Sequence, residues 1–328
     1  MFRKDLYHKL GSLGFCGVTT PERFGGLGLG SIEAAAVLEE FAKISPAYAV
    51  TVSVNNLPQF VLARFGGDDL QQRYIPRLAN GAWLSAFALS ESHAGSDASA
   101  LRCRAVRDAD RYYLNGTKCW ITSGPVADVF LVMARTDDNG AKGISAFMVE
   151  ADSAGISTGR PEEKMGLRAS HTTTVSFQDT PIPVENRVGP EGAGFRIAMQ
   201  ALDAGRIAIG AIAVGIAQAA LDQSLSYACE REQFGQAIIG FQGVSFLLAD
   251  MAMAVESSRL MVHRAAALRD AGRQHSLEAA MAKCHATDTA MRVTTDAVQV
   301  HGGSGYTNAF PVERMMRDAT IWGSESVV

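Results

Sequence analysis

The spacing of hydrophobic and polar residues changes twice along the chain and divides it into three regions. Over residues 1–80 the spacing is helical. The clearest helix follows a glycine-rich loop and covers residues 31–44, with Ser31 as the expected N-cap. Residues 68–81 predict a further short helix with Asp68 as its cap. The first region is therefore expected to be helical.

The second region has the composition of strands. Between residues 83 and 178, six short runs rich in β-branched and aromatic residues are separated by Gly, Asp, Asn and Pro. Such runs predict a small β-barrel or sandwich. Asn115-Gly116 is a hairpin signal within this region.

In the third region the helical period returns, after a linker at 180–186. Three long stretches, about 192–230, 240–271 and 276–300, are separated by short connections that contain glycine. Helices joined by short connections pack antiparallel, so this region predicts the core of a helical bundle.

Three glycines, Gly205, Gly210 and Gly215, lie inside the first of these long helices. Each costs about 1 kcal/mol of helix stability relative to alanine. We expect the close approach of another helix or of a ligand to compensate for this cost.

Composition narrows the class of protein. The chain has 328 residues, which suggests two or three domains, with 47% hydrophobic residues, 20% charged residues and a net charge of −4. These values are typical of a globular protein and do not suggest nucleic-acid binding. The longest apolar stretch, 207–221, is shorter than the roughly 20 residues that cross a bilayer, so we expect a buried helix and no membrane insertion.

The cysteines indicate the compartment. The chain has five of them, at positions 16, 103, 119, 229 and 284, with no C-x-x-C pair. An odd, scattered set is typical of a reducing compartment, and the N-terminal residues are too polar for a signal peptide. We expect a bacterial cytoplasmic location, with the mitochondrial matrix as the alternative.

Several common functional motifs are absent from the sequence. It contains no dinucleotide-binding G-x-G-x-x-G after a strand, no P-loop, no H-E-x-x-H and no G-x-S-x-G. The seven histidines lack ligand spacing with cysteines or carboxylates, so no metal site is expected. The glycine-rich segment 25–30 is interpreted as a plain loop.

One loop has a composition suited to ligand binding. In segment 87–97 a strand ends at Ser90 and is followed by Glu91, Gly95 and Ser96. Glycine lets a backbone approach a ligand closely, and hydroxyl and N–H groups can hold a pyrophosphate or the edge of a heterocycle. By itself this stretch is better explained as a turn between strands.

Five further segments change that interpretation. In chain order after "ALSESHAGSD" come "LNGTKCWITSG" (114–124), "KMGLRASHTTTVSF" (164–177), "ALDAGRIAIGAIAVGIAQAALD" (201–222), "REQFGQAIIGFQ" (231–242) and "DAVQVHGGSGYTNAFPVERMMRDA" (296–319). Together the six resemble the acyl-CoA dehydrogenase family, nearest its short- and medium-chain members. The resemblance covers nearly the whole chain.

The resemblance implies a multi-domain α+β fold. The N-terminal helical domain would cover residues 1–82, the middle β-barrel or sandwich domain 83–188, and the C-terminal four-helix bundle 189–328. It also implies a homotetramer, FAD as cofactor, and electron-transferring flavoprotein as electron acceptor. The reaction would be α,β-dehydrogenation of an acyl-CoA thioester to a 2-enoyl-CoA, an oxidoreductase step of fatty acid β-oxidation and lipid metabolism.

The resemblance assigns flavin contacts in the β-region. Residues that would line or cover the flavin are Phe87, Leu89, Ser90, Gly95, Ser96, Trp120, Ile121 and Thr122. Ser90 stands where most relatives have Thr, and Thr122 would offer a hydrogen bond to flavin N5. Such contacts tune a flavin, whereas the redox chemistry belongs to the cofactor. The alternative for Trp120 is an ordinary core residue.

A second set would reach the FAD of a neighbouring subunit: Arg231, Phe234, Gln242, Gln299, Gly302 and Gly303. An arginine fork suits a pyrophosphate because it donates two hydrogen bonds at once. The alternative for Arg231 is a solvated charge at a helix end. Ser96, Ser170, Asp203 and Arg206 would contact the coenzyme A part of the substrate, although Asp203 and Arg206 could instead form an i,i+3 surface pair.

The resemblance leaves two positions open for the catalytic base. The reaction needs a carboxylate beside the thioester in a dry site. Relatives place that glutamate either where this chain has Gly205, or after "RDA", where this chain has Ser326 with Glu325 one residue earlier.

Two interpretations follow for the base. With a one-residue deletion, Glu325 is the base. Alternatively, the tail has diverged from about Trp322 and the chain is truncated at both ends relative to the family. It would then be a partial enzyme, or a non-catalytic FAD- or acyl-CoA-binding protein, that lacks the glutamate.

Overall fold

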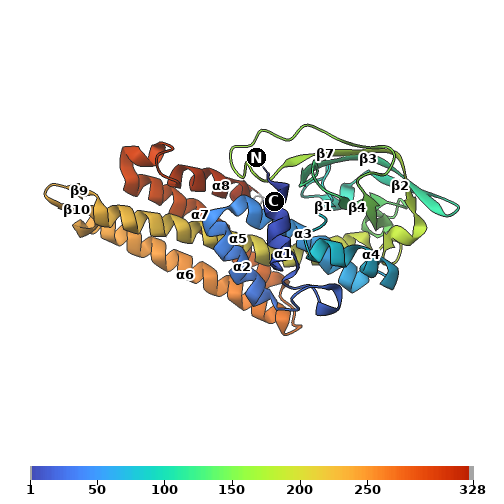
Figure 1. Ribbon diagram of the computed structural model, residues 1–328, viewed down its shortest axis with the longest axis horizontal. Helices are drawn as coiled ribbons and strands as arrows, with labels where there is room; N and C mark the ends of the chain where they lie inside the picture. Colours follow the sequence, from blue (N-terminus) through green and yellow to red (C-terminus); the bar gives the residue numbers. More distant parts are fainter. Residues whose placement is uncertain (1, 325–328) are drawn as a thin grey trace. The chain divides into compact units, whose positions relative to one another are not determined.

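The computed structural model describes residues 2–324, with side chains described as far as residue 322 (Figure 1). Within this range the chain forms two compact units. Unit 1 comprises the residues up to Leu29, Thr51–Glu163 and Ala169–Gly205, and unit 2 comprises Gly30–Val50, Lys164–Arg168 and the residues from Arg206 onward. The domain boundaries expected from the sequence remain predictions.

The helical region predicted at the start of the chain is confirmed. Its helices are α1 (Lys4–Ser12), α2 (Ser31–Ile44), α3 (Pro46–Phe65) and α4 (Asp68–Ala79). The N-cap of α4 is Gly67, so Asp68 is the first helical residue rather than the cap. An acidic residue in the first turn still complements the helix dipole.

The strands of unit 1 form one mixed sheet. They are β1 (Ser85–Ala88), β2 (Arg104–Asp108), β3 (Arg111–Thr122), β4 (Val129–Arg135), β5 (Ile144–Glu150), β6 (Ile156–Thr158), β7 (Thr172–Pro183) and β8 (Arg187–Val188). The order is β6-β7-β3-β2-β4-β5-β8, and β1 pairs in parallel with β4.

The sheet curls rather than lying flat. Phe130 of β4 and Phe177 of β7 have ring centroids 6.3 Å apart, and Tyr112 of β3 and Phe147 of β5 are 4.9 Å apart. Each pair sits three strands apart in the sheet order, which in a flat sheet would be about 14 Å. The sheet therefore folds over its own face, as the predicted barrel or sandwich requires.

Strand β4 is buried on both faces. Val129, Leu131 and Met133 pack in a core with residues of α3 and α4, whereas Phe130 and Val132 pack inside the curled sheet. Burial on both faces explains why this strand is a continuous apolar run instead of an alternating one.

The predicted hairpin at Asn115-Gly116 is wrong. Strand β3 continues through both residues, and the turn before it lies at Ala109, where φ is +50°. The ladder between β3 and β7 shifts register at Gly116, whose φ is +144° and whose Cβ, if present, would lie 2.7 Å from the Cα of Cys103. Glycine is needed here for a bulge and a close approach, not for a hairpin turn.

The long helices predicted for the third region are confirmed, and they belong to unit 2 except for the first part of the first helix, which up to Gly205 belongs to unit 1. They are α5 (Gly194–Glu230), α6 (Gln242–Asp270) and α7 (Ser276–His301), followed by α8 (Val312–Ser324). Figure 1 shows α5, α6 and α7 lying side by side. A small hairpin, β9 (Glu232–Gln233) and β10 (Gln236–Ala237), joins α5 to α6.

The glycines inside α5 differ in their surroundings. An added Cβ would lie 2.3 Å from the Glu39 carbonyl oxygen at Gly215 and 2.9 Å from a methyl of Val262 at Gly210. Close helix approach is therefore confirmed at these two positions. It is absent at Gly205, where the nearest described atom would be a Leu57 methyl at 3.7 Å.

Helix α5 is also the one described helix long and apolar enough to cross a membrane. In its most apolar window, 72% of the residues are buried inside the structure. That degree of burial agrees with the buried helix predicted over 207–221.

The cap of α2 comes from a distant residue. The N-cap position is Gly30, and the Asp270 carboxylate accepts the backbone N–H of Ser31 at 2.7 Å and of Ile32 at 3.2 Å. The prediction that Ser31 is the N-cap is therefore wrong. The side chain that satisfies the free N–H groups belongs to the end of α6.

Candidate active site

The predicted site residues fall into two sets, one in each unit. Unit 1 holds Phe87, Leu89, Ser90, Gly95, Ser96, Trp120, Ile121, Thr122, Ser170 and Asp203, and unit 2 holds Arg206, Arg231, Phe234, Gln242, Gln299, Gly302 and Gly303. Glu325 and Ser326 lie outside the described residues.

Unit 1 brings the two predicted flavin segments together. The end of β1 leads into Leu89 and Ser90, and the end of β3 carries Trp120 and Thr122. The backbone N–H of Cys119 donates to the Ser90 carbonyl at 2.8 Å, so the two segments lie side by side. Segments that are far apart in sequence thus form one continuous surface.

Trp120 occupies a strained position on this surface. Its φ is +60°, in the left-handed region, and the ladder between β3 and β7 shifts register between Lys118 and Ile121. The indole is 65% exposed, so the alternative that Trp120 is a core residue is wrong. Backbone strain of this kind persists where surrounding structure enforces it and is common at functional sites.

The neighbouring side chains differ in accessibility. Ser90 and Thr122 are half-buried, whereas Ile121 is buried inside the curled sheet and can contact a ligand only through its backbone. An added Cβ at Gly95 would meet no atom within 4 Å, and Ser96 is exposed. Ser170 is buried. The surface therefore offers an indole, two hydroxyl groups and open space beside a glycine.

A buried ion pair lies directly behind this surface. The Lys118 ammonium is 2.8 Å from Glu91 Oε1, with the two side chains 0% and 4% exposed. Lys118 also donates to the Leu89 carbonyl at 2.9 Å, and Glu91 accepts the backbone N–H groups of Arg102 and Cys103. Every charged atom of the pair thus has a partner among the described residues.

Sequence reasoning missed Lys118. The signal was that Lys118 shares the strand face of the apolar residues Tyr112 and Leu114, where a buried lysine requires a buried partner. Burial raises the pKa of Glu91, but the Lys118 ammonium and the two N–H donors outweigh it and hold the pKa below its usual value. Burial is the main cause that raises the pKa of the adjacent Cys103 thiol to about 11, with a further contribution from the Glu91 charge.

In unit 2 the predicted cofactor residues lie near one end of the helices. An aromatic cluster joins the ends of α5 and α7, with the rings of Tyr227 and His301 stacked at 4.3 Å and Phe310 against both. Near it, Arg231, Gln242, Gln299, Gly302 and Gly303 are exposed, and Phe234 is 95% exposed. The predicted cofactor residues at this end of unit 2 are therefore accessible to a ligand.

His301 itself is buried with an unused nitrogen. Its Nδ1 lies 2.8 Å from the Ala297 carbonyl, which fixes that nitrogen as the donor. The Nε2 has no hydrogen-bond partner in the part of the chain that is described. Burial lowers the pKa of His301 below its usual value, which favours the neutral ring.

Helix α8 holds the loop that precedes Ser170. Arg317 donates to the Met165 carbonyl at 2.8 Å, and the Leu167 N–H donates to Asp318 at 2.6 Å. An added Cβ at Gly166 would lie 2.3 Å from the Arg317 carbonyl oxygen, which explains the glycine. Arg317 and Asp318 of the "RDA" motif therefore fix the loop at residues 164–168 through these hydrogen bonds.

The candidate substrate residues Asp203 and Arg206 lie one helical turn apart on α5, and both are half-buried. Gly205, the alternative base position, lies between them. Because an added Cβ there would make only ordinary contact with Leu57, a larger side chain is sterically tolerated at this position.

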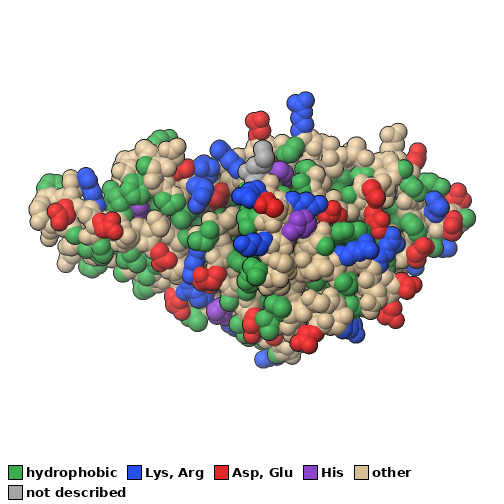
Figure 2. Space-filling view, viewed as in Figure 1, with side chains coloured by type: hydrophobic (Ala, Val, Ile, Leu, Met, Phe, Trp, Pro, Cys, Tyr) green, Lys and Arg blue, Asp and Glu red, His purple; other side chains and the backbone are tan. Residues whose placement is uncertain are grey.

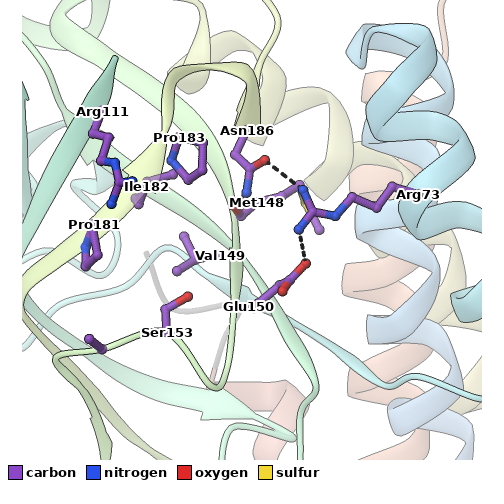
Figure 3. A pocket seen from close by; sticks show the side chains of 11 residues that line it. Arg73, Arg111, Met148, Val149, Glu150, Ser153, Pro181, Ile182, Pro183 and Asn186 are labelled. Atoms are coloured by element: carbon purple, nitrogen blue, oxygen red, sulfur yellow. Dashed lines mark hydrogen bonds and ion pairs between the residues drawn. The ribbon is translucent and has the colours of Figure 1, made fainter. Parts of the chain in front are cut away.

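A pocket elsewhere in unit 1 does not contain the predicted site. It has a volume of about 250 Å³ and lies between the end of β5 and the end of β7 (Figure 3). Arg73 in its wall is paired with Glu150 at 2.5 Å and with Asn186 at 3.4 Å. None of the predicted flavin or substrate residues lines it. Across the described chain, no group of three His, Cys, Asp or Glu residues is placed to hold a metal ion.

Known proteins match the chain along its whole length. The N-terminal, middle and C-terminal domains of acyl-CoA dehydrogenase match residues 1–82, 86–180 and 192–323. The probable acyl-CoA dehydrogenase FadE25 of Mycobacterium tuberculosis is 47% identical over 322 residues, which is 98% of this chain and 83% of the relative.

Solved structures agree with these matches. Butyryl-CoA dehydrogenase from Megasphaera elsdenii has a TM-score of 0.95 at 41% identity, covering 98% of this chain and 86% of that one. A chain from a structural study of the electron transferring flavoprotein of Acidaminococcus fermentans has a TM-score of 0.96 at 44% identity. The match covers 98% of this chain and 85% of that one.

These matches define a multi-domain α+β oxidoreductase with a helical N-terminal part, a β middle part and a helical C-terminal part, which confirms the predicted fold class. The chain belongs to the acyl-CoA dehydrogenase family, whose members are flavoproteins. The predicted family and its FAD cofactor are confirmed.

The residues present fit a flavin. An exposed indole at a left-handed backbone position can stack on a heterocycle, and the Ser90 and Thr122 hydroxyls beside it can donate to polar ring atoms. No bulky side chain fills the space beside Gly95.

Proposed function

We propose that this protein catalyses the α,β-dehydrogenation of an acyl-CoA thioester, with FAD bound at the surface formed by Ser90, Trp120 and Thr122. The hydrogen bond of 2.8 Å between Cys119 and Ser90 is the observation that carries the proposal. It joins the two segments that a flavin must contact together. When bound, FAD supplies the acceptor for the hydride that leaves the β-carbon of the substrate.

The chain's own residues orient the reactants. Ser90 and Thr122 would hold the polar edge of the flavin through their hydroxyls, and Trp120 would cover the ring and exclude water. Arg206 and Asp203 lie on one helix in half-buried positions where they suit the polar coenzyme A part. A carboxylate beside the thioester would take the α-proton. Glu325 is the candidate carboxylate of this chain, whereas Ser326 and Gly205 stand at the two positions where the resemblance places the glutamate.

A homo-oligomer, in the tetrameric form usual for the family, completes the site in this proposal. Phe246, Met253 and Leu260 are exposed and seven residues apart on α6, so they lie on one stripe of that helix. Figure 2 shows hydrophobic side chains at the surface over this part of unit 2. If a second copy of the chain covers the stripe, its FAD would be the ligand that Arg231 and Phe234 contact.

The remaining expectations follow the relatives. A short straight acyl chain is the proposed substrate, because butyryl-CoA dehydrogenase is among the similar structures. Electron-transferring flavoprotein is the proposed electron acceptor, and a cytoplasmic step of fatty acid β-oxidation is the proposed role.

The proposal is tested by the colour of the protein. The purified protein should be yellow and oligomeric, and butyryl-CoA added without oxygen should bleach its 450 nm region, the usual flavin band. A protein that takes up no added FAD would contradict the proposal. Isovaleryl-CoA and octanoyl-CoA serve as controls for acyl branching and length.

A further inference from the structure

The ion pair between Lys118 and Glu91 is placed where it can act on both flavin segments. Lys118 donates to the Leu89 carbonyl, and the next residue, Cys119, donates its N–H to the Ser90 carbonyl. Glu91 then accepts from Lys118 itself at 2.8 Å. Three consecutive residues of one segment are therefore held by two consecutive residues of the other.

The backbone changes direction directly after this pair. Lys118 is still in register with Val175 of β7, and the register is lost before Ile121. Trp120 in between has a left-handed φ of +60°, and Ser123 has one of +66°. Lys118 is the last residue of β3 paired with β7 before this second register shift, so its contacts hold the strand at the point where the irregularity begins.

Stability alone does not account for a buried ion pair. Removing two charges from water is costly, and a hydrophobic pair of similar volume is often as stable or more stable. Buried ionic groups are best explained where they select one arrangement over others. The arrangement selected here is the contact between the two flavin segments.

We propose that Lys118 and Glu91 are positioning residues for the flavin: they fix the Leu89–Ser90 and Cys119–Thr122 segments against each other, and their charges act on the reduction potential of the bound ring. The inference rests on the proposed function, because it requires FAD at this surface. Neither side chain reaches that surface, since both are buried behind it.

The two charges have effects of opposite sign. Lys118→Met removes the ammonium and leaves Glu91 with the N–H donors of Arg102 and Cys103 but without its counter-charge, so the pair loses its positive charge and the Glu91 carboxylate, where ionised, is unbalanced. A negative charge behind the ring opposes the arrival of electrons, so the midpoint potential should fall. Glu91→Gln leaves either an ammonium or a neutral amine, and neither can lower the potential.

A control must remove a buried polar network of unit 1 that has no flavin segment in it. Gln59 is buried, accepts from Thr20 at 2.6 Å and donates to the Cys16 carbonyl at 2.9 Å. Gln59→Met matches Lys118→Met in the residue introduced. It should lower thermal stability without changing the flavin.

The experiment compares the parent, Lys118→Met, Glu91→Gln, the double variant and Gln59→Met. For each, the Kd for FAD, the thermal midpoint of the FAD-free protein and the flavin midpoint potential are measured. We expect the Kd to rise about ten- to a hundredfold in Lys118→Met and Glu91→Gln. The potential should fall only in Lys118→Met, and the double variant should lie near the parent.

The outcomes separate this inference from the proposed function. If the parent binds no FAD, the proposed function fails and the inference with it. If the parent binds FAD but the Lys118 and Glu91 variants match Gln59→Met in Kd and potential, only the inference is overturned. Should Lys118→Met not fold, the Kd of Glu91→Gln and of the charge-free double variant decides the question in the same way.

Discussion

The backbone N–H of Leu167 donates a hydrogen bond of 2.6 Å to Asp318, although 151 residues separate the two in sequence. Leu167 has a φ of +48°, a conformation that a leucine adopts only when its surroundings enforce it. Asp318 is buried at the "RDA" motif of α8. The carboxylate thus holds a strained loop residue in place, which gives the motif a structural reason.

This bond gives a pH-dependent prediction. Burial raises the pKa of Asp318, so the stability it contributes is complete below the ordinary value of 3.8 and is lost as pH rises through the higher folded value. Asp318→Asn keeps an oxygen that accepts the Leu167 N–H and removes the charge. We expect the variant to gain stability relative to the parent as pH rises from about 4 to about 7, measured by urea unfolding of the FAD-free protein.

For Glu313, on the same helix, we expect the contribution to stability to change with pH in the opposite direction. A hydrogen bond from Arg317 lowers the pKa of Glu313, so its contribution is present above 4.5 and is lost as pH falls through the lower folded value. Glu313→Gln should therefore be at its largest disadvantage above pH 4.5 and approach the parent in acid. Equal slopes in the two variants would contradict the assignment of either shift.

The position of the base can be found by substitution. If Ser326 occupies the base position, the parent should bind acyl-CoA and reduce its flavin slowly, and Ser326→Glu should accelerate reduction about 10²–10⁴-fold. Gly205→Glu offers a second route, because the added side chain has room beside Leu57. The rate is that of anaerobic flavin bleaching in a stopped-flow instrument.

Glu325→Gln is the decisive control for the base. With Ser326 at the base position, this variant should bleach as slowly as the parent. Fast bleaching in the parent that Glu325→Gln abolishes would make Glu325 the base.

Arg231 is predicted to hold FAD rather than the substrate. Arg231→Ala should weaken FAD binding about ten- to a hundredfold, the effect of one charge-assisted hydrogen bond, and leave acyl-CoA affinity nearly unchanged. Arg273→Ala, at another exposed arginine beyond the far end of α6, is the matched control. Titration of the FAD-free protein with FAD, followed by fluorescence, gives both values. Equal losses in the two variants would make Arg231 an ordinary surface charge.

Two glycines of α5 should respond oppositely to alanine. At Gly215 the added methyl would lie 2.3 Å from the Glu39 carbonyl oxygen, so α2 and α5 must separate and the variant should lose about 1–3 kcal/mol of stability. At Gly205 there is space, and the gain in helix propensity should stabilise the variant by about 0.5–1 kcal/mol. Denaturant midpoints of Gly215→Ala and Gly205→Ala test the pair. A stable Gly215→Ala protein would mean that the helices are less closely packed than described.

The stripe on α6 is predicted to lie in a subunit interface. Met253→Glu places a charge at the centre of the stripe, between Phe246 and Leu260, and burying that charge without a partner is costly. The variant should therefore have a lower molecular mass in solution by light scattering, and it should lose FAD. Ile44→Glu, at an exposed apolar residue of α2, should keep the parent's mass. An unchanged mass in Met253→Glu would exclude this face from the interface.

The parts of the fold that follow from local pattern were predictable. The ranges of α5, α6 and α7 could be predicted because each helix is long and its apolar period persists over many turns. Ser31 was wrongly expected to cap α2 because the real cap, Asp270, comes from the other end of the sequence. At Gly116 the sequence could not distinguish a hairpin from a bulge, since both need a glycine with positive φ.

In the candidate site, too, features that depend on local motifs could be predicted and features that depend on distant contacts could not. The two flavin segments could be predicted to be functional from their motifs, but not their contact through Cys119 and Ser90, which depends on strand pairing. Lys118 was missed because its partner, Glu91, is 27 residues away in sequence. Motifs identify residue types that suit a ligand, whereas buried pairs behind them are visible only after folding.

The cap on α2 also bears on the order of synthesis. Ser31 and Asp270 are 239 residues apart, so α2 leaves the ribosome long before the carboxylate that satisfies its first N–H groups exists. Residues 30–50 belong to the same compact unit as the residues from Arg206 onward, and the β-sheet is translated in between. Until Asp270 is made, Glu33 can satisfy the Gly30 N–H at 2.9 Å, but the N–H groups of Ser31 and Ile32 lack their carboxylate. Helix α2 would therefore be a suitable site for chaperone binding in that interval.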